Sequence, residues 1–121
     1  MKAHGYADLS WNKNVLTLDA YGPFNEEGIK LVFEQVKESV LNKNIKHWCR
    51  IEKLDEETMG SALTLSFVNE LYLWADKHGC YATAVIISNL IQAQAIADVL
   101  TGKNAKLFQH IDEAQKWISL Q

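Results

Sequence analysis

The sequence predicts an α/β fold in which four helices cover a five-stranded mixed sheet. The central observation is the apolar run of residues 81–88, which is rich in β-branched side chains and bounded by Gly79 and Asn89. A run of this length and composition is typical of a strand that is buried on both faces. The segments before and after it have helical periodicity. A strand placed between two helices in sequence indicates an α/β unit with parallel neighbours.

An antiparallel hairpin is predicted at the N-terminal end. Residues 6–11 and 15–21 flank a short polar connection, and in the second segment Leu16 and Leu18 alternate with Thr17 and Asp19. This alternation is typical of a half-buried strand, and the short connection favours direct pairing of the two segments.

The first helix is predicted from Asn25 to about Leu41. Asn25 is a favourable N-cap residue, and Glu26 and Glu27 follow in the first turn, where the helix dipole stabilises negative charge. Apolar residues then recur at helical spacing: Ile29, Val32, Phe33, Val36 and Val40.

The third strand is predicted over residues 45–54, again from alternation. Trp48, Arg50 and Glu52 share one face, which we expect to be partly open to water or to a partner. With an aromatic residue of the hairpin nearby, this face could form an interface, because Trp and Arg are enriched at interface centres. It could equally be a charge pattern on a wet sheet face.

Three further helices and two strands complete the order β-β-α-β-α-β-α-β-α. The second helix is predicted over residues 61–78 with Gly79 as its C′ residue, and the third is capped at Ser88-Asn89. A short fifth strand over 105–111 precedes a last helix capped by Asp112. Right-handed crossovers make strands two to five largely parallel, with the first strand antiparallel at an edge.

Size and charge limit the classes of function. The chain of 121 residues fits one domain, and its net charge of −3 argues against a nucleic-acid partner. No segment is apolar over the roughly 20 residues needed for stable membrane insertion. Cys49 and Cys80 are interpreted as reduced thiols, so we expect a cytoplasmic protein.

The second helix carries more apolar surface than one sheet-facing stripe of about 100° requires. The surplus could pack against a neighbouring helix or the hairpin. Alternatively, it could form an exposed patch for a protein partner, a second subunit or an apolar ligand. The residues concerned are Leu63, Leu65, Phe67, Val68, Leu71, Tyr72, Leu73 and Trp74.

Signals for chemistry are weak. His47 and Cys49 point the same way on the third strand, and His110 could join them, but a metal site needs three or four ligands. Cys80 follows a helix C-terminus, where the dipole disfavours a thiolate. The helix start at Ser88-Asn89 suits an anion, although a plain N-cap explains it. Nucleophile-elbow and phosphate-loop motifs are missing, so we expect no metal, no cofactor and no enzyme activity.

Three segments carry a family resemblance: residues 18–24, Thr58–Gly60 and residues 112–118, whose sequences are LDAYGPF, TMG and DEAQKWI. With the order of elements, they resemble the SpoIIAA-like group, within or close to the STAS superfamily of anti-sigma-factor antagonists. The resemblance covers nearly the whole chain and implies a β-α superhelix with a mixed sheet. It also implies a regulatory binding module rather than a catalyst, and some relatives resemble Sec14-type lipid carriers.

The phosphorylation motif of the antagonists, Asp-Ser-Ser-Gly at the start of the second helix, is altered here. The best match is Glu57-Thr58-Met59-Gly60, in which Met59 stands at the phosphate-accepting position and cannot carry phosphate. Thr58 or Ser61 could substitute if the register slips by a residue or two.

We therefore expect a single STAS-like domain over residues 1–121 that acts as a non-catalytic interaction module through its second helix. The partner would be another protein or a second copy of the chain. The alternative is a small apolar, lipid-like ligand in a cavity between this helix and the sheet, lined by Met59, Leu63 and Phe67. The candidate binding residues are Thr58, Met59, Leu63, Leu65, Phe67 and Trp74.

Overall fold

The computed structural model describes residues 2–58 and 62–121, together with side chains outside residues 62–64. Five strands and four helices alternate in the predicted order. They are β1 (Tyr6–Asn12), β2 (Val15–Tyr21), α1 (Glu26–Lys43), β3 (Trp48–Leu54), α2 (Ala62–Lys77), β4 (Cys80–Ile86), α3 (Leu90–Leu100), β5 (Ala105–Phe108) and α4 (Ile111–Ser119). No helix in these ranges is both long and apolar enough to span a bilayer.

The strands form one sheet in the order β1-β2-β3-β4-β5. β1 pairs antiparallel with β2, and the three remaining pairs are parallel. The predicted hairpin, the parallel strands and the antiparallel edge strand are confirmed. Short crossovers that each contain one helix account for this order, since parallel neighbours need such a connection.

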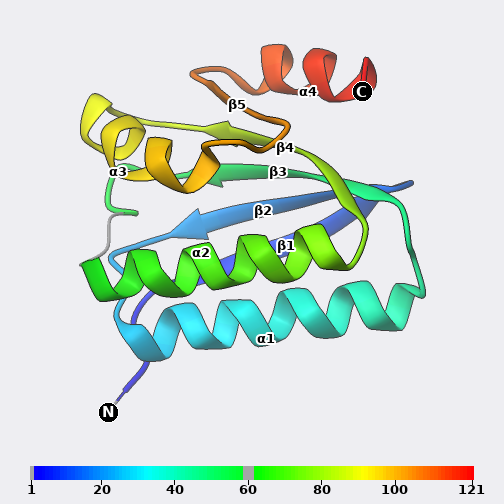
Figure 1. Ribbon diagram of the computed structural model, residues 1–121. Helices are drawn as coiled ribbons and strands as arrows, with labels where there is room; N and C mark the ends of the chain where they lie inside the picture. The colour runs from blue at the N-terminus through cyan, green and yellow to red at the C-terminus, as the bar shows by residue number, and fades with distance from the viewer. Residues whose placement is uncertain (1, 59–61) are drawn as a thin grey trace.

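Helices cover both faces of the sheet, but unequally (Figure 1). The larger core cluster joins one face to α1, α2 and α3, with Val36, Leu71 and Ile96 among its buried members. The smaller cluster joins the opposite face to α4 through Ala114 and Ile118. The face that carries α1, α2 and α3 therefore holds most of the core.

Asn25 begins α1 as predicted and also holds the N-terminal segment. Its Oδ1 accepts from Gly28 N at 2.9 Å and from His4 N at 2.8 Å, while its Nδ2 donates to Lys2 O at 2.8 Å. A Cβ at Gly28 would lie 1.8 Å from His4 O, so this close approach requires glycine. Asn89 caps α3 in the same way, accepting from Gln92 N at 2.9 Å.

The prediction of an open face on the third strand is wrong. Trp48, Arg50 and Glu52 are 0%, 1% and 7% exposed. Their side chains lie on the face of the sheet that carries the larger core cluster. β3 is the middle strand of five, with helices over both of its faces, so residues 48–52 are buried on both sides and only its last two residues, Lys53 and Leu54, are exposed or half-buried. Trp48 packs edge-on against Trp11, with ring centroids 5.8 Å apart, and its Nε1 donates to the carbonyl of His78 at 2.9 Å. The two aromatic residues thus meet inside the protein.

The C-terminal boundaries also differ from prediction. β5 ends at Phe108, and α4 begins at Ile111 with His110 as its N-cap, whose side chain makes no capping hydrogen bond. The prediction of Asp112 as the cap is wrong. Asp112 instead lies with Glu113 in the first turn, where a carboxylate interacts favourably with the helix dipole.

Candidate ligand-binding cavity

A cavity of about 80 Å³ lies between α2 and the sheet, with α1 and α3 at its sides. Hydrocarbon makes up most of its wall, and the polar side chains on it are Glu52, Thr58, Tyr72 and Gln92. The apolar lining residues are Ala7, Leu18, Ala20, Phe24, Ile29, Val32, Leu54, Leu65, Val68, Leu71, Ala95 and Ile96. Of the predicted binding residues, the structure places Thr58 and Leu65 on this wall.

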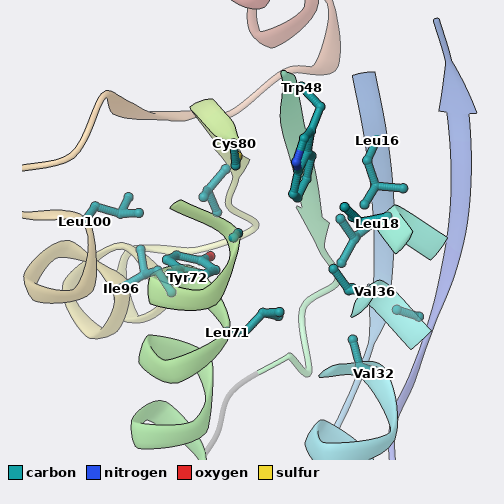
Figure 2. Close-up of a cluster of buried hydrophobic side chains, with 14 residues drawn as sticks. Leu16, Leu18, Val32, Val36, Trp48, Leu71, Tyr72, Cys80, Ile96 and Leu100 are labelled. Carbon is teal, nitrogen blue, oxygen red and sulfur yellow. The ribbon is translucent and has the colours of Figure 1, made fainter. Parts of the chain in front are cut away.

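The apolar side chains of α2 pack against the sheet, against α3 and against α1, and some of them remain exposed. Leu71, Tyr72 and Ala75 are buried against the sheet, and Figure 2 shows Tyr72 beside Ile96 of α3. Leu73 is 47% exposed. Neighbouring elements of the same chain therefore cover part of this apolar surface, which is the first alternative given by the sequence. Another part of it borders a cavity.

Phe67 and Trp74 lie along the contact between α1 and α2 rather than at the cavity. The Trp74 ring packs edge-on against Phe33 with centroids 6.4 Å apart, and Lys30 Nζ lies 5.1 Å from the centre of the Phe67 ring. The prediction that Phe67 lines the cavity is wrong, because α1 covers that side of α2. The other two predicted lining residues, Met59 and the Leu63 side chain, lie outside the described residues.

A buried polar cluster of Arg50, Glu52 and Tyr72 stands beside the cavity. Arg50 Nε lies 3.4 Å from Glu52 Oε1, close enough for an ion pair but not aligned as a hydrogen bond. The Tyr72 hydroxyl donates to Glu52 Oε2, and the Arg50 guanidinium stacks 4.1 Å from the centre of the Tyr72 ring. Arg50 Nη2 also donates to Thr83 Oγ1 at 3.3 Å, whereas Nη1 has no hydrogen-bond partner within the described part of the chain.

The cluster fixes the protonation of two of its members. Burial raises the pKa of Tyr72 well above its ordinary value, and the negative charge of Glu52 adds to this rise. Burial lowers the pKa of Arg50, but the negative charge of Glu52 and smaller contributions from other neighbouring groups together raise it by more, so the net shift is upward. Tyr72 is therefore a neutral hydrogen-bond donor and Arg50 a permanent cation, because both changes favour the protonated form.

Asp55 organises the rim where β2 and β3 end. Its Oδ1 accepts from Gly22 N at 3.2 Å, from Glu57 N at 3.1 Å and from Thr58 Oγ1 at 2.5 Å. Burial raises the pKa of Asp55, but these hydrogen bonds lower it by more, so the net shift is downward. A Cβ at Gly22 would lie 2.3 Å from Glu57 O, so glycine is needed for the loops to meet.

Gln92 joins the same rim to α3. It is 2% exposed, its Nε2 donates to Asp55 O at 2.5 Å, and its Oε1 accepts from Ser88 N at 2.8 Å. Both ends of the amide are thus engaged with backbone. The Thr58 hydroxyl, which also lies 3.1 Å from Ala20 O, is similarly engaged. Of the four polar lining groups, Glu52 keeps the most unused acceptor capacity, since a carboxylate offers about four acceptor positions.

The possible metal ligands are not brought together. His47 lies outside β3, is exposed, and stacks on Tyr81 with ring centroids 3.9 Å apart, whereas Cys49 is buried. His110 stands before α4. Within residues 2–58 and 62–121, no three side chains of the ligand types gather. Of the two possible phosphate-accepting residues, Thr58 is half-buried and Ser61 lies outside the described residues.

Sequence reasoning missed Glu52, Tyr72 and Gln92 as cavity residues. A signal for the first two was present: charged residues two apart on a strand whose neighbouring positions, Trp48, Cys49 and Ile51, are apolar, and a tyrosine within the apolar stripe of the next helix. Buried charges are almost always paired, so this combination favours an internal ion pair over a wet face.

Comparison with known proteins identifies the fold. No family model and no curated protein matches the chain. Among solved structures, the chain is similar to the protein TM1081, with a TM-score of 0.69 at 16% identity over 93% of this chain and 88% of that one. It is also similar to an uncharacterised DUF3478 protein with a SpoIIAA-like fold from Shewanella loihica PV-4. That match has a TM-score of 0.67 at 15% identity and covers 98% of this chain and 96% of the other. The SpoIIAA-like fold implied by the resemblance is confirmed.

Proposed function

We propose that this protein is a non-catalytic binding module that holds a small, mainly apolar molecule between α2 and the sheet. The observation that carries the proposal is the cavity of about 80 Å³, whose wall, among the described side chains, is hydrocarbon apart from four polar groups. Protein interiors are packed with few voids larger than a water molecule, and ligand sites are mostly apolar with a few placed polar groups. The module would act in the cytoplasm, where its buried thiols Cys49 and Cys80 stay reduced.

The state of the polar groups favours binding over catalysis. Glu52 is held by Arg50 and by the Tyr72 hydroxyl, and the raised pKa of Tyr72 keeps that hydroxyl protonated near neutral pH. A general base needs a pKa near the working pH, which Tyr72 does not have. The SpoIIAA-like fold is also compatible with a regulatory module.

Filling the cavity tests the proposal. Ala95 on α3 lines it and is half-buried, whereas Ala97 on the same helix is exposed and lies outside its wall. We expect Ala95→Leu to occupy the cavity and abolish ligand uptake, and Ala97→Leu to leave uptake unchanged. Native mass spectrometry of gently purified protein, followed by extraction of any retained small molecule, measures this. Equal uptake by both variants, or none by the unmodified protein, would contradict the proposal.

A second candidate is a protein partner or a homodimer at the side of α1 and α2 that faces away from the sheet. It is favoured by apolar residues exposed on both helices: Leu73 is 47% exposed and Leu31 is 56% exposed. Exposed apolar patches commonly mark protein contacts. Under this proposal, sedimentation should show self-association or a complex that Leu73→Lys weakens. A strict monomer that binds no purified candidate partner would count against it.

A further inference from the structure

The Glu52 carboxylate is the only ionised group on the wall of the cavity within the described part of the chain. It is 7% exposed, and its two known interactions leave acceptor positions free: Tyr72 donates to Oε2, and Arg50 approaches Oε1 at 3.4 Å without hydrogen-bond alignment. A carboxylate in an apolar wall strongly favours any donor that reaches it, because a buried acceptor without a partner is unfavourable.

The charges already present limit what kind of donor fits. Arg50 and Glu52 together carry no net charge, and Arg50 is a permanent cation whose pKa is raised. A cationic ligand would therefore add an uncompensated positive charge to an apolar site, and an anionic ligand would face the Glu52 carboxylate. Both cases are strongly unfavourable. A neutral molecule avoids both penalties.

We propose that the ligand is a small neutral molecule with an apolar body and one N–H or O–H group, which donates a hydrogen bond to the Glu52 carboxylate. This inference rests on the proposed ligand-binding function. Leu65, Leu71 and Ile96 contact the apolar body, and Tyr72 orients the carboxylate by holding its other oxygen. Glu52 is thus the group that sets specificity.

The cavity size narrows the class further. Its volume of about 80 Å³ is roughly half that of an engineered apolar cavity of about 150 Å³ that binds benzene. A five-membered ring or a short branched chain matches this space better than a long acyl chain. Alcohols and N–H heterocycles of that size are the chemical class assigned to the site.

Pyrrole and furan test the donor directly, because they are rings of nearly equal size and only pyrrole has an N–H group. Titrations of each into uniformly ¹⁵N-labelled protein, followed through the amides of Leu65, Leu71 and Ile96, give both affinity and location. We expect pyrrole to bind about tenfold more tightly or better, as a hydrogen bond to a charged group allows. If these amides report equal affinities for the two rings, or a higher affinity for furan, the proposed hydrogen bond to Glu52 is overturned. The proposal that the cavity binds a ligand then still stands. Shifts confined to other residues, or no binding of either ring, overturn both.

A variant pair separates the role of Glu52 from folding. Replacing Glu52 alone leaves Arg50 buried without a counter-ion and risks unfolding, so Arg50→Met is combined with Glu52→Leu to keep the volume filled. This double variant should fold and bind both rings with roughly equal affinity. The Glu56→Gln variant, at an exposed position outside the cavity wall, should keep the preference for pyrrole. A folded double variant that still prefers pyrrole overturns the assignment of Glu52.

Discussion

Arg50 and Glu52 form an ion pair two residues apart on β3, with side chains that are 1% and 9% exposed. Glu52→Gln should lower the free energy of unfolding by about 3–5 kcal/mol, because it leaves the guanidinium buried without a counter-charge. Urea unfolding followed by circular dichroism measures the change, with the exposed Glu56→Gln as the control. The double variant Arg50→Met with Glu52→Leu should lose far less. Equal losses in the single and double variants would show that packing, rather than charge, dominates at this position.

Asp55 makes stability depend on pH on the acid side. Its hydrogen bonds lower its pKa in the folded protein, so its contribution is fully present above the unfolded pKa of about 3.9 and is lost as the pH falls through the folded value. Asp55→Asn should therefore flatten the decline of the urea midpoint between about pH 5 and pH 2.5. Asp112→Asn, in the first turn of α4, is a suitable comparison. An unchanged slope in Asp55→Asn would contradict the assignment.

At the scale of elements, α1 depends on its N-terminal residue. Asn25→Ala removes the cap from Gly28 N and both contacts to the segment before β1. We expect a loss of about 0.5–2 kcal/mol in unfolding free energy, typical of a lost N-cap. Faster hydrogen exchange should appear in the first turn of α1. Asn42→Ala, exposed near the other end of the same helix, should change little. Comparable losses in the two variants would mean that the cap is unimportant.

At the scale of the whole molecule, one sheet joins two core clusters of unequal size. Ile118 on α4 is 5% exposed in the smaller cluster, whereas Ile91 on α3 is 59% exposed. Ile118→Ala should cost about 2–5 kcal/mol, as for other buried large-to-small changes, and Ile91→Ala far less. Thermal unfolding followed by circular dichroism compares them. A small effect at Ile118 would mean that α4 is not needed for the stability of the sheet.

The sequence was sufficient for the fold because hydrophobic period and caps act locally. The alternation in β2, the Asn25 cap and the helix–strand order each predicted a feature of the structure. The site was harder, because it depends on which helix covers which face. Alternation along β3 correctly grouped Trp48, Arg50 and Glu52, but it could not reveal that α2 lies over that group.

The division of α2 between a cavity and a contact with α1 was also invisible in the sequence. Leu65 and Phe67 both belong to the apolar surplus, yet Leu65 lines the cavity and Phe67 meets Lys30 of α1. The two positions differ by about 200° around a helix, but the neighbour on each side is set by tertiary packing. Periodicity could predict the excess of apolar surface without predicting its partners.

One face of the sheet is covered by a single helix, α4, and this has a consequence for unfolding. α4 is the shortest helix, and among the described helices it is the one that packs against Cys49, Ile51 and Ala84 on that face. If α4 detaches while α1, α2 and α3 stay packed on the opposite face, the result is a partly unfolded form with an exposed apolar sheet face. Such partly unfolded forms have low populations at equilibrium but aggregate readily. Mutations that loosen α4 should therefore promote precipitation before they abolish the native circular dichroism signal.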